Sequence, residues 1–138
     1  MPRTMTTSTR RVDADFTVEK LALRLADITT TAGTIFKFTP AKPGRIASVD
    51  WVTTQVGTGA SATITFTPSV NGVGVQAGTL VVALADTAAI GQKKAGAAVT
   101  GLNNFDDNDE VGIATSATTV FTAGSGYLLL SLDYCVED

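Results

Sequence analysis

The segment TITFTPSVNGVGVQAGTLVVALA (63–85) constrains the fold more than any other part of this sequence. In its first half apolar and polar side chains alternate with a period of two, so that Ile64 and Phe66 share one face of a strand and threonines share the other. Asn71-Gly72 then supplies the residue pair that most readily adopts the positive φ angles of a two-residue hairpin turn. A half-buried antiparallel strand followed by a tight turn is therefore predicted, with a second strand at 79–85.

Short alternating runs separated by turn residues recur along most of the chain. Within residues 16–26, Leu21, Leu23 and Leu25 alternate with other residues, which favours a strand, although the composition of this run also permits a helix. Pro40, Pro43 and Gly44 predict a turn before the next strand, because proline fixes φ and cannot donate to a sheet ladder. The residues expected on inward faces are Leu21, Leu23, Leu25, Phe36, Phe38, Ala47, Val49, Trp51, Ala62, Ile64, Phe66, Pro68, Val70, Leu80, Val82, Leu84, Val111, Ile113, Leu128, Leu130, Leu132 and Tyr134.

Two glycine-rich or polar segments are less regular than the rest. Residues 72–78 are compatible with a short strand or with a looped crossing, and 86–104 are expected to form a surface connection with one short strand around 97–102. About seven to nine short strands, with no convincing helix, predict an all-β fold: a single-domain antiparallel β-sandwich of jelly-roll type, preceded by an extended N-terminal arm. The division is a flexible arm at 1–15 and the β-sandwich domain at 16–138.

The composition excludes most chemistry, because the chain has no histidine and a single cysteine, Cys135. A serine-hydrolase triad, a zinc site built from Cys and His, and a disulfide within the chain all lack the residues they need. Cys135 is expected to be a small packing residue at the end of a strand, with a reactive thiol as the alternative. The prediction is a protein that is not an enzyme and has no cofactor and no metal.

The densest polar cluster is FDDNDE (105–110). Its carboxylates could wrap a calcium ion, but the run lacks the glycine and the twelfth-position glutamate of an EF-hand loop. The favoured interpretation is a solvated turn in which Asp and Asn side chains cap their own backbone. The acids lie side by side in one loop, whereas a glycosidase needs two carboxyl groups facing each other across a cleft.

Charge is distributed unevenly between the arm and the body. Arg3, Arg10 and Arg11 lie in a segment without acids, whereas 12–138 hold 7 basic and 13 acidic residues. Three positive charges on an acidic body are a weak footprint for nucleic acid, so no direct nucleic-acid contact is predicted, and docking of the arm on another protein or a merely solubilising tail are the alternatives. No apolar run approaches the roughly 20 residues of a membrane-spanning helix, and no secretory signal is recognised, so neither a membrane contact nor export is expected.

Four stretches of the chain together resemble a known group of proteins: FKFTPAKPGRIASV, TITFTPSVNG, VTGLNNFDDNDEVGIATSA and GYLLLSLDY. They are similar to the small jelly-roll proteins of tailed bacteriophages, especially the capsid decoration, or cement, proteins. The resemblance implies a homotrimer that binds the major capsid protein on the outer face of the phage head and stabilises the shell. It also implies localisation to the virion after synthesis in the host cytoplasm, with the arm residues Arg3, Arg10 and Arg11 contacting the capsid or a neighbouring subunit.

Two alternatives share the same outline. A phage tail, baseplate or head-fibre subunit differs from a capsid protein only in its location. A carbohydrate-binding or receptor-binding jelly-roll module should display exposed aromatic side chains, whereas Trp51, Tyr127 and Tyr134 lie in predicted strands where packing is the expected role.

Overall fold

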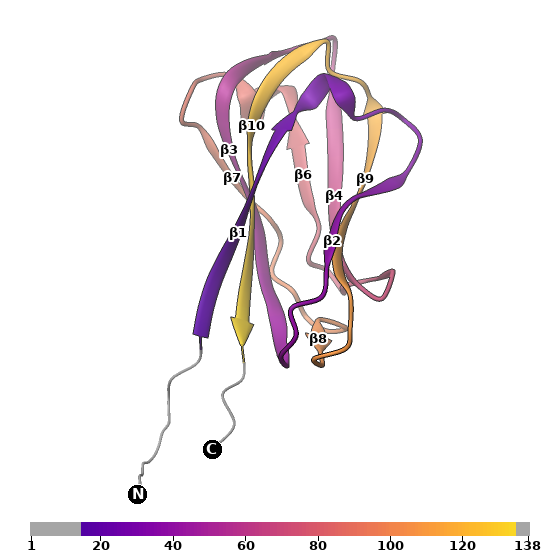
Figure 1. The fold of residues 1–138 in the computed structure, drawn as a ribbon. Helices are drawn as coiled ribbons and strands as arrows, with labels where there is room; N and C mark the ends of the chain where they lie inside the picture. Colours follow the sequence, from indigo (N-terminus) through magenta and orange to yellow (C-terminus); the bar gives the residue numbers. More distant parts are fainter. Residues whose placement is uncertain (1–14, 135–138) are drawn as a thin grey trace, which may run out of the picture.

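The computed structural model describes residues 15–134, which are almost entirely β-structure (Figure 1). Two short 3-10 helices, η2 (Leu25–Asp27) and η3 (Leu84–Thr87), follow strands. The strands are β1 (Asp15–Arg24), β2 (Gly33–Phe38), β3 (Gly44–Thr58), β4 (Thr63–Val70), β5 (Val73–Gly74), β6 (Leu80–Ala83), β7 (Lys93–Ala95), β8 (Asn104–Phe105), β9 (Val111–Thr119) and β10 (Ala123–Tyr134).

The strands form two antiparallel sheets that face each other across one core (Figure 1). The first sheet has the order β1-β10-β3-β7, with β8 also paired to β3, and the second has the order β2-β9-β4-β5, with β6 also paired to β4. From β1 to β4 each successive strand changes sheet, and the return strands β9 and β10 insert between earlier ones. This nested antiparallel connectivity is that of a jelly roll, so the predicted fold class is confirmed.

The centre of the core joins the two sheets through a pair of aromatic rings. Trp51 of β3 stacks on Phe66 of β4, with ring centroids 6.3 Å apart, and both side chains are fully buried. The indole N–H of Trp51 donates to the Thr53 hydroxyl at 2.9 Å, so the buried polar atom is satisfied. Gly126 of β10 makes room for the indole, because a Cβ there would lie 2.3 Å from the ring. The interpretation of Trp51 as a packing residue is confirmed.

One predicted inward residue of β3 is wrong because the strand contains a bulge. The register jumps from Ser131 opposite Ser48 to Leu132 opposite Ile46, which leaves Ala47 without a partner. An extra residue reverses the alternation from that point. Ile46 is consequently buried in the core, while Ala47 is only half-buried.

The hairpin predicted at Asn71-Gly72 is confirmed. Both residues have positive φ, 52° and 80°, and the turn joins β4 directly to β5. Pro68, unusual within a central strand, accepts a hydrogen bond from Val75 N–H through its carbonyl. The nitrogen and the carbonyl of a strand residue point to the same side. The N–H that Pro68 lacks would therefore point at the place where the partner of β4 changes from β6 to β5, so no ladder bond is lost there.

The strand predicted at 79–85 is shorter than expected and ends at Ala83. There the Asp86 carboxylate accepts a hydrogen bond from Ala83 N–H at 2.9 Å, and the Thr87 hydroxyl donates to the carbonyl of Leu84. These local bonds replace the ladder and turn the chain into η3. Leu84 therefore packs against the core from a helix rather than from the strand.

The short strand expected around 97–102 is wrong. The chain instead pairs as β7 and β8 on either side of that segment, and within it only Gly101 forms an isolated bridge, with Gln76. Ala97 N–H donates to Thr79 and Thr100 N–H to Gln76, so no single partner strand runs along this segment. It spans the gap between β7 of one sheet and β6 of the other and closes that side of the sandwich.

The two ends of the sandwich are distinct (Figure 1). Asp15 pairs with Tyr134, which pairs with Gly44, so the start of β1, the end of β10 and the start of β3 meet at one end, together with β8. We call this the acidic end, because residues 106–110 lie there. The opposite end, here the capped end, carries η2, η3 and the buried Phe121.

Candidate functional site

The acidic cluster at 106–110 is a turn that caps itself. Asp106 N–H donates to the carboxylate of Asp109 at 2.8 Å, and Asp109 N–H returns a bond to the Asp106 carbonyl at 3.2 Å. This is the arrangement that the sequence favoured over a calcium loop. Within residues 15–134, no group of three or more His, Cys, Asp or Glu side chains is placed to hold a metal ion.

Asn71 ties this turn to the β4–β5 hairpin. Its side-chain amide donates to Asp109 at 2.9 Å and accepts from Glu110 N–H at 2.9 Å, while its own N–H donates to the Glu110 carbonyl at 2.7 Å. The backbone hydrogen bond from Asp106 and the bond from Asn71 favour the ionised form and hold the pKa of Asp109 below its ordinary value. Asn71 therefore links the β4–β5 hairpin to the turn at 106–110 by three hydrogen bonds.

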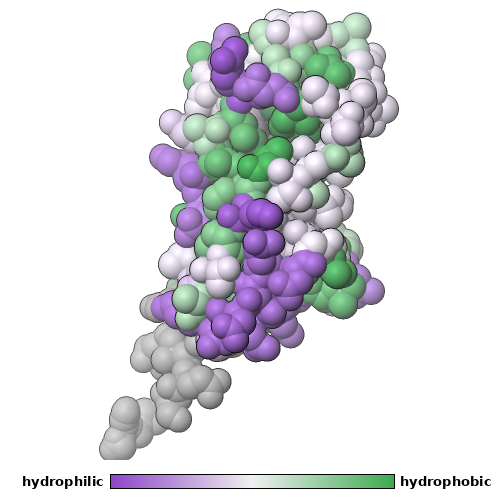
Figure 2. All heavy atoms as spheres, turned by 45° about the vertical axis from the view of Figure 1, so that its right-hand side comes forward, coloured by the Kyte–Doolittle hydropathy of each residue, from purple (hydrophilic) through white to green (hydrophobic). Residues whose placement is uncertain are grey.

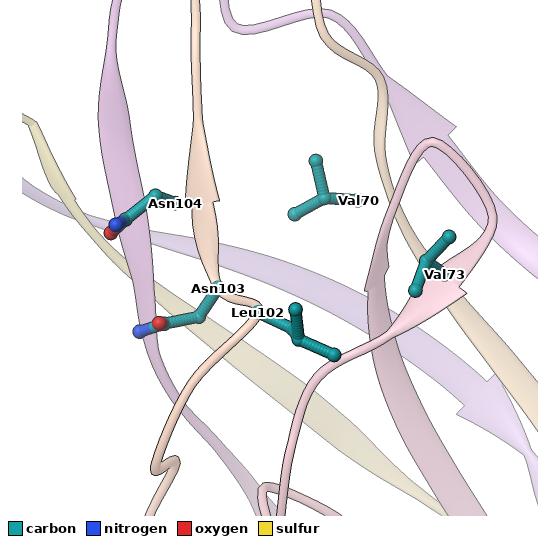
Figure 3. Close-up of a pocket in the computed structure, with 5 residues that line it drawn as sticks. All are labelled: Val70, Val73, Leu102, Asn103 and Asn104. Carbon is teal, nitrogen blue, oxygen red and sulfur yellow. The ribbon is translucent and has the colours of Figure 1, made fainter.

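A hollow of about 440 Å³ lies beside these two loops, lined by Val70, Val73, Leu102, Asn103 and Asn104. Figure 3 shows Leu102 across from the hairpin that carries the two valines. Val73 is 57% exposed and Leu102 59% exposed, so two large apolar side chains border an open space. Three aliphatic side chains and two asparagines line the hollow, and the acidic turn lies next to it, because Asn71, which follows Val70, bonds to Asp109 and Glu110.

Leu102 has a backbone conformation that a leucine rarely adopts. Its φ is 57°, in the left-handed region, where a Cβ costs roughly 1–2 kcal/mol. On one side Gln76 bonds to Thr100 and Gly101. On the other side the Asn103 carbonyl accepts a bond from Ile46 N–H, and its side-chain amide donates to the Ile46 carbonyl at 2.8 Å. The residue between these two anchors is forced outwards, and this strain occurs at an exposed apolar residue.

Sequence reasoning did not single out Val73 and Leu102. The only local signal is one apolar residue isolated among glycine and asparagine, in NGVGV and TGLNN. The predicted contact residues Arg3, Arg10 and Arg11 lie outside the described residues, as does Cys135.

The side of the sandwich between β1 and β2 is open. These strands are the edges of their sheets on that side, and their inner residues are only partly buried against the core. Figure 2 shows a hydrophobic band along the middle of this face, with hydrophilic side chains above and below it. The residues concerned are Leu21, Leu23, Ile35, Phe36 and Phe38.

The outer faces of the two sheets differ in character. On the first sheet, Phe16 and Val18 of the edge strand are 61% and 47% exposed. On the second, the threonines of β4 lie beside small residues of β9, with Thr65 opposite Ser116 and Thr67 opposite Ala114. The predicted flat, weakly polar threonine face is present.

The aromatic residues that a carbohydrate site would display are largely packed. Tyr134 is buried with its ring edge-on to Phe105, and Tyr127 is half-buried with the Lys20 ammonium 4.5 Å from its ring centroid. Trp51 and Tyr134 are therefore packing residues, as expected, whereas Tyr127 lies on the outer face and lines a hollow of about 340 Å³ with Arg24 and Thr54. No helix among the described residues is long and apolar enough to cross a membrane.

Comparisons with known proteins show no family for this chain. No protein-family model matches it, and a search of curated proteins finds no relative. Among solved structures, it is similar to a chain from the disulfide-linked pili of Bacillus endospore appendages, with 14% identity and a TM-score of 0.41 over 97% of this chain and 100% of that chain. Neither function nor partner follows from a likeness this low.

Proposed function

We propose that this protein is a structural subunit of a virus particle, a decoration protein that binds the outer face of a phage head and stabilises the shell. The observation that carries the proposal is a jelly roll with exposed contact faces, above all Phe16 and Val18 on the outer face of an edge strand. Exposed apolar groups of this size on one outer face, and a threonine row on the outer face of the other sheet, suit a protein that works through contact area. The resemblance of the four sequence stretches to phage decoration proteins points the same way.

The mechanism is additive contact rather than chemistry. Each subunit buries a modest face against the major capsid protein and against its neighbours in a homotrimer. Because the subunits are held in a symmetric array, many weak contacts act at a high effective concentration and together give tight binding. The arm carrying Arg3, Arg10 and Arg11 supplies a contact with the capsid or with a neighbouring subunit.

The test is to locate the protein on particles. Antibody raised against the purified protein, coupled to gold, is applied to particles from the cells whose genome encodes this chain and viewed by negative-stain microscopy. We expect gold on the heads. Gold confined to tails would transfer the proposal to a tail or baseplate subunit, and unlabelled particles would reject a structural virion role.

A second measurement isolates the arm. A chain lacking residues 1–14 should keep its β circular dichroism spectrum but bind stripped heads less than the full chain does. Full binding by the truncated protein would reject the arm as a contact.

A further inference from the structure

We propose that the hollow at the acidic end is a receptor for residues 1–14 of a second copy of this chain. The inference deepens the proposed function by naming the arm's partner. It requires only a second copy, so it can hold even if the particle role fails.

Charge complementarity is the first argument. Asp106, Asp107 and Glu110 are exposed on the turn next to the hollow, and none of them forms an ion pair with another residue of 15–134. Two cations at the same end have other contacts: Arg45 is paired with Asp133 at 3.1 Å, and the Lys42 ammonium lies 4.9 Å from the ring centroid of Tyr134. Residues 1–14 carry three arginines and one acid, Asp13, so the arm has a net positive charge opposite in sign to the three exposed carboxylates.

The apolar lining is the second argument. Val73 and Leu102 are more than half exposed, and Leu102 is held in a strained conformation that keeps its side chain at the surface. Met5 of the arm lies between Arg3 and Arg10 in the sequence. A flexible thioether side chain adapts to an irregular apolar hollow, while the flanking arginines reach the acidic turn.

Placement favours a neighbour over the same subunit. Fourteen extended residues span at most about 46–50 Å, which exceeds the roughly 35 Å width of a domain of this size, so length alone permits docking on either copy. The arm enters β1, which is the edge of its sheet, and the hollow lies at the opposite edge, between β5 and the segment before β8. When copies stand side by side, the β1 edge of one copy therefore meets the hollow of the next.

Both features lie at the same end of the fold, and this fixes the kind of assembly. An arm that leaves at the acidic end and docks at the acidic end of its neighbour joins subunits in parallel. Such a head-to-tail contact closes into a ring where the rotation between neighbours divides a full turn, and otherwise it extends into a filament. The proposed homotrimer is one such ring.

The experiment measures the mass of the full chain by light scattering after size exclusion. We expect an oligomer that becomes a monomer when residues 1–14 are removed, when Arg3, Arg10 and Arg11 are changed to Glu, or when Asp106, Asp107 and Glu110 are changed to Lys. A chain carrying both sets of changes should recover the oligomer. Asp27→Lys, an exposed acid at the capped end, is the matched control and should leave the mass unchanged.

A labelled peptide of residues 1–14 gives the affinity. Its binding to the chain lacking 1–14, followed by fluorescence anisotropy, should weaken about fivefold to a hundredfold on the triple Lys change, since exposed ion pairs contribute about 0.2–1 kcal/mol each. Leu102→Gly should also weaken it, with an unchanged β spectrum showing that the variant is folded.

Three results would overturn the proposal. A full chain that is monomeric while the peptide still binds would show that the arm occupies its own hollow. An oligomer that survives removal of the arm would place the interface elsewhere. Failure of the double charge reversal to restore the oligomer, in a chain that remains folded, would reject the pairing of arm and acidic turn.

Discussion

The capped and acidic ends of the sandwich differ in how much room they leave around their residues. At the capped end, a Cβ on Gly124 would lie 2.8 Å from the Cα of Gly57, and a Cβ on Gly57 would lie 2.2 Å from the Thr87 hydroxyl. At the acidic end, Gly72 has nothing within 4 Å of its Cβ position, and Leu102 faces an open hollow. The strands of the acidic end are packed as closely, since a Cβ on Gly44 would lie 2.7 Å from the Asp133 carbonyl, so the contrast is between the packed capped end and the loops around the hollow, which are held by hydrogen bonds.

This difference separates stability from recognition. Close packing transmits any change in volume, whereas exposed loops fixed by hydrogen bonds tolerate side-chain changes at the surface. We therefore expect substitutions at the capped end to act on folding, and substitutions at the acidic end to act on assembly.

The largest loss of stability is expected from truncating Phe121, the buried aromatic residue of the capped end. Phe121 is 1% exposed, so Phe121→Ala should lower the free energy of unfolding by about 3–5 kcal/mol. Leu102→Ala, the corresponding truncation at the acidic end, should change it by only about 0.5 kcal/mol. Urea denaturation of both variants tests the pair, and similar losses would contradict the contrast between the ends.

A smaller loss is expected from adding volume at the capped end. Gly57→Ala should cost about 1–3 kcal/mol, because the new methyl group would meet Thr87 and Phe121. Gly33→Ala is the control within the β2 edge strand, since nothing lies within 4 Å of its Cβ position. Equal thermal midpoints for the two variants would show that the capped end can relax.

Removal of the link between the two loops of the acidic end should have a moderate effect. Asn71→Gly keeps the positive φ of the turn but loses the side-chain bonds to Asp109 and Glu110, and we expect a loss of about 1–2 kcal/mol. The measurement is chemical denaturation, together with peptide binding. A variant as stable as the native protein would mean that the hairpin alone fixes the loop.

For a substitution at Leu102, we expect no loss in the free energy of unfolding. Leu102→Gly relieves the left-handed strain, so the free energy of unfolding should stay unchanged or rise by up to about 1 kcal/mol while assembly is lost. A variant that is no less stable but assembles less would show that the Leu102 side chain contributes to assembly and not to folding. A clear loss of stability would show instead that Leu102 contributes mainly to the core.

The smallest effect is a pH dependence at Asp109. Because its pKa is lowered in the folded state, its contribution to stability is present above the ordinary carboxyl pKa near 4 and is lost as the pH falls through the lowered value. The difference in thermal midpoint between the native protein and Asp109→Asn should therefore shrink from neutral pH towards pH 2–3. A difference that stays constant across this range would contradict the role of the ionised carboxylate.

The sequence predicted the regular parts of the sandwich well. The inward row from Leu128 to Tyr134, the threonine face of β4 and the Asn71-Gly72 turn all follow from alternation and turn chemistry, which act over a few neighbouring residues. It did not predict the bulge at Ala47, because an unpaired residue is defined only by the register against β10. The segment 97–102 was likewise misread, since its partners come from separate parts of the chain.

The class of fold was thus determined by the sequence itself, through short alternating runs and the turns between them. The hollow at the acidic end was decided by the tertiary structure alone. Thr100 and Asn103 are anchored to residues 24 and 57 positions away, and these anchors force Leu102 between them into its strained, exposed conformation. No local pattern carries that information, because the constraint exists only when distant strands have paired.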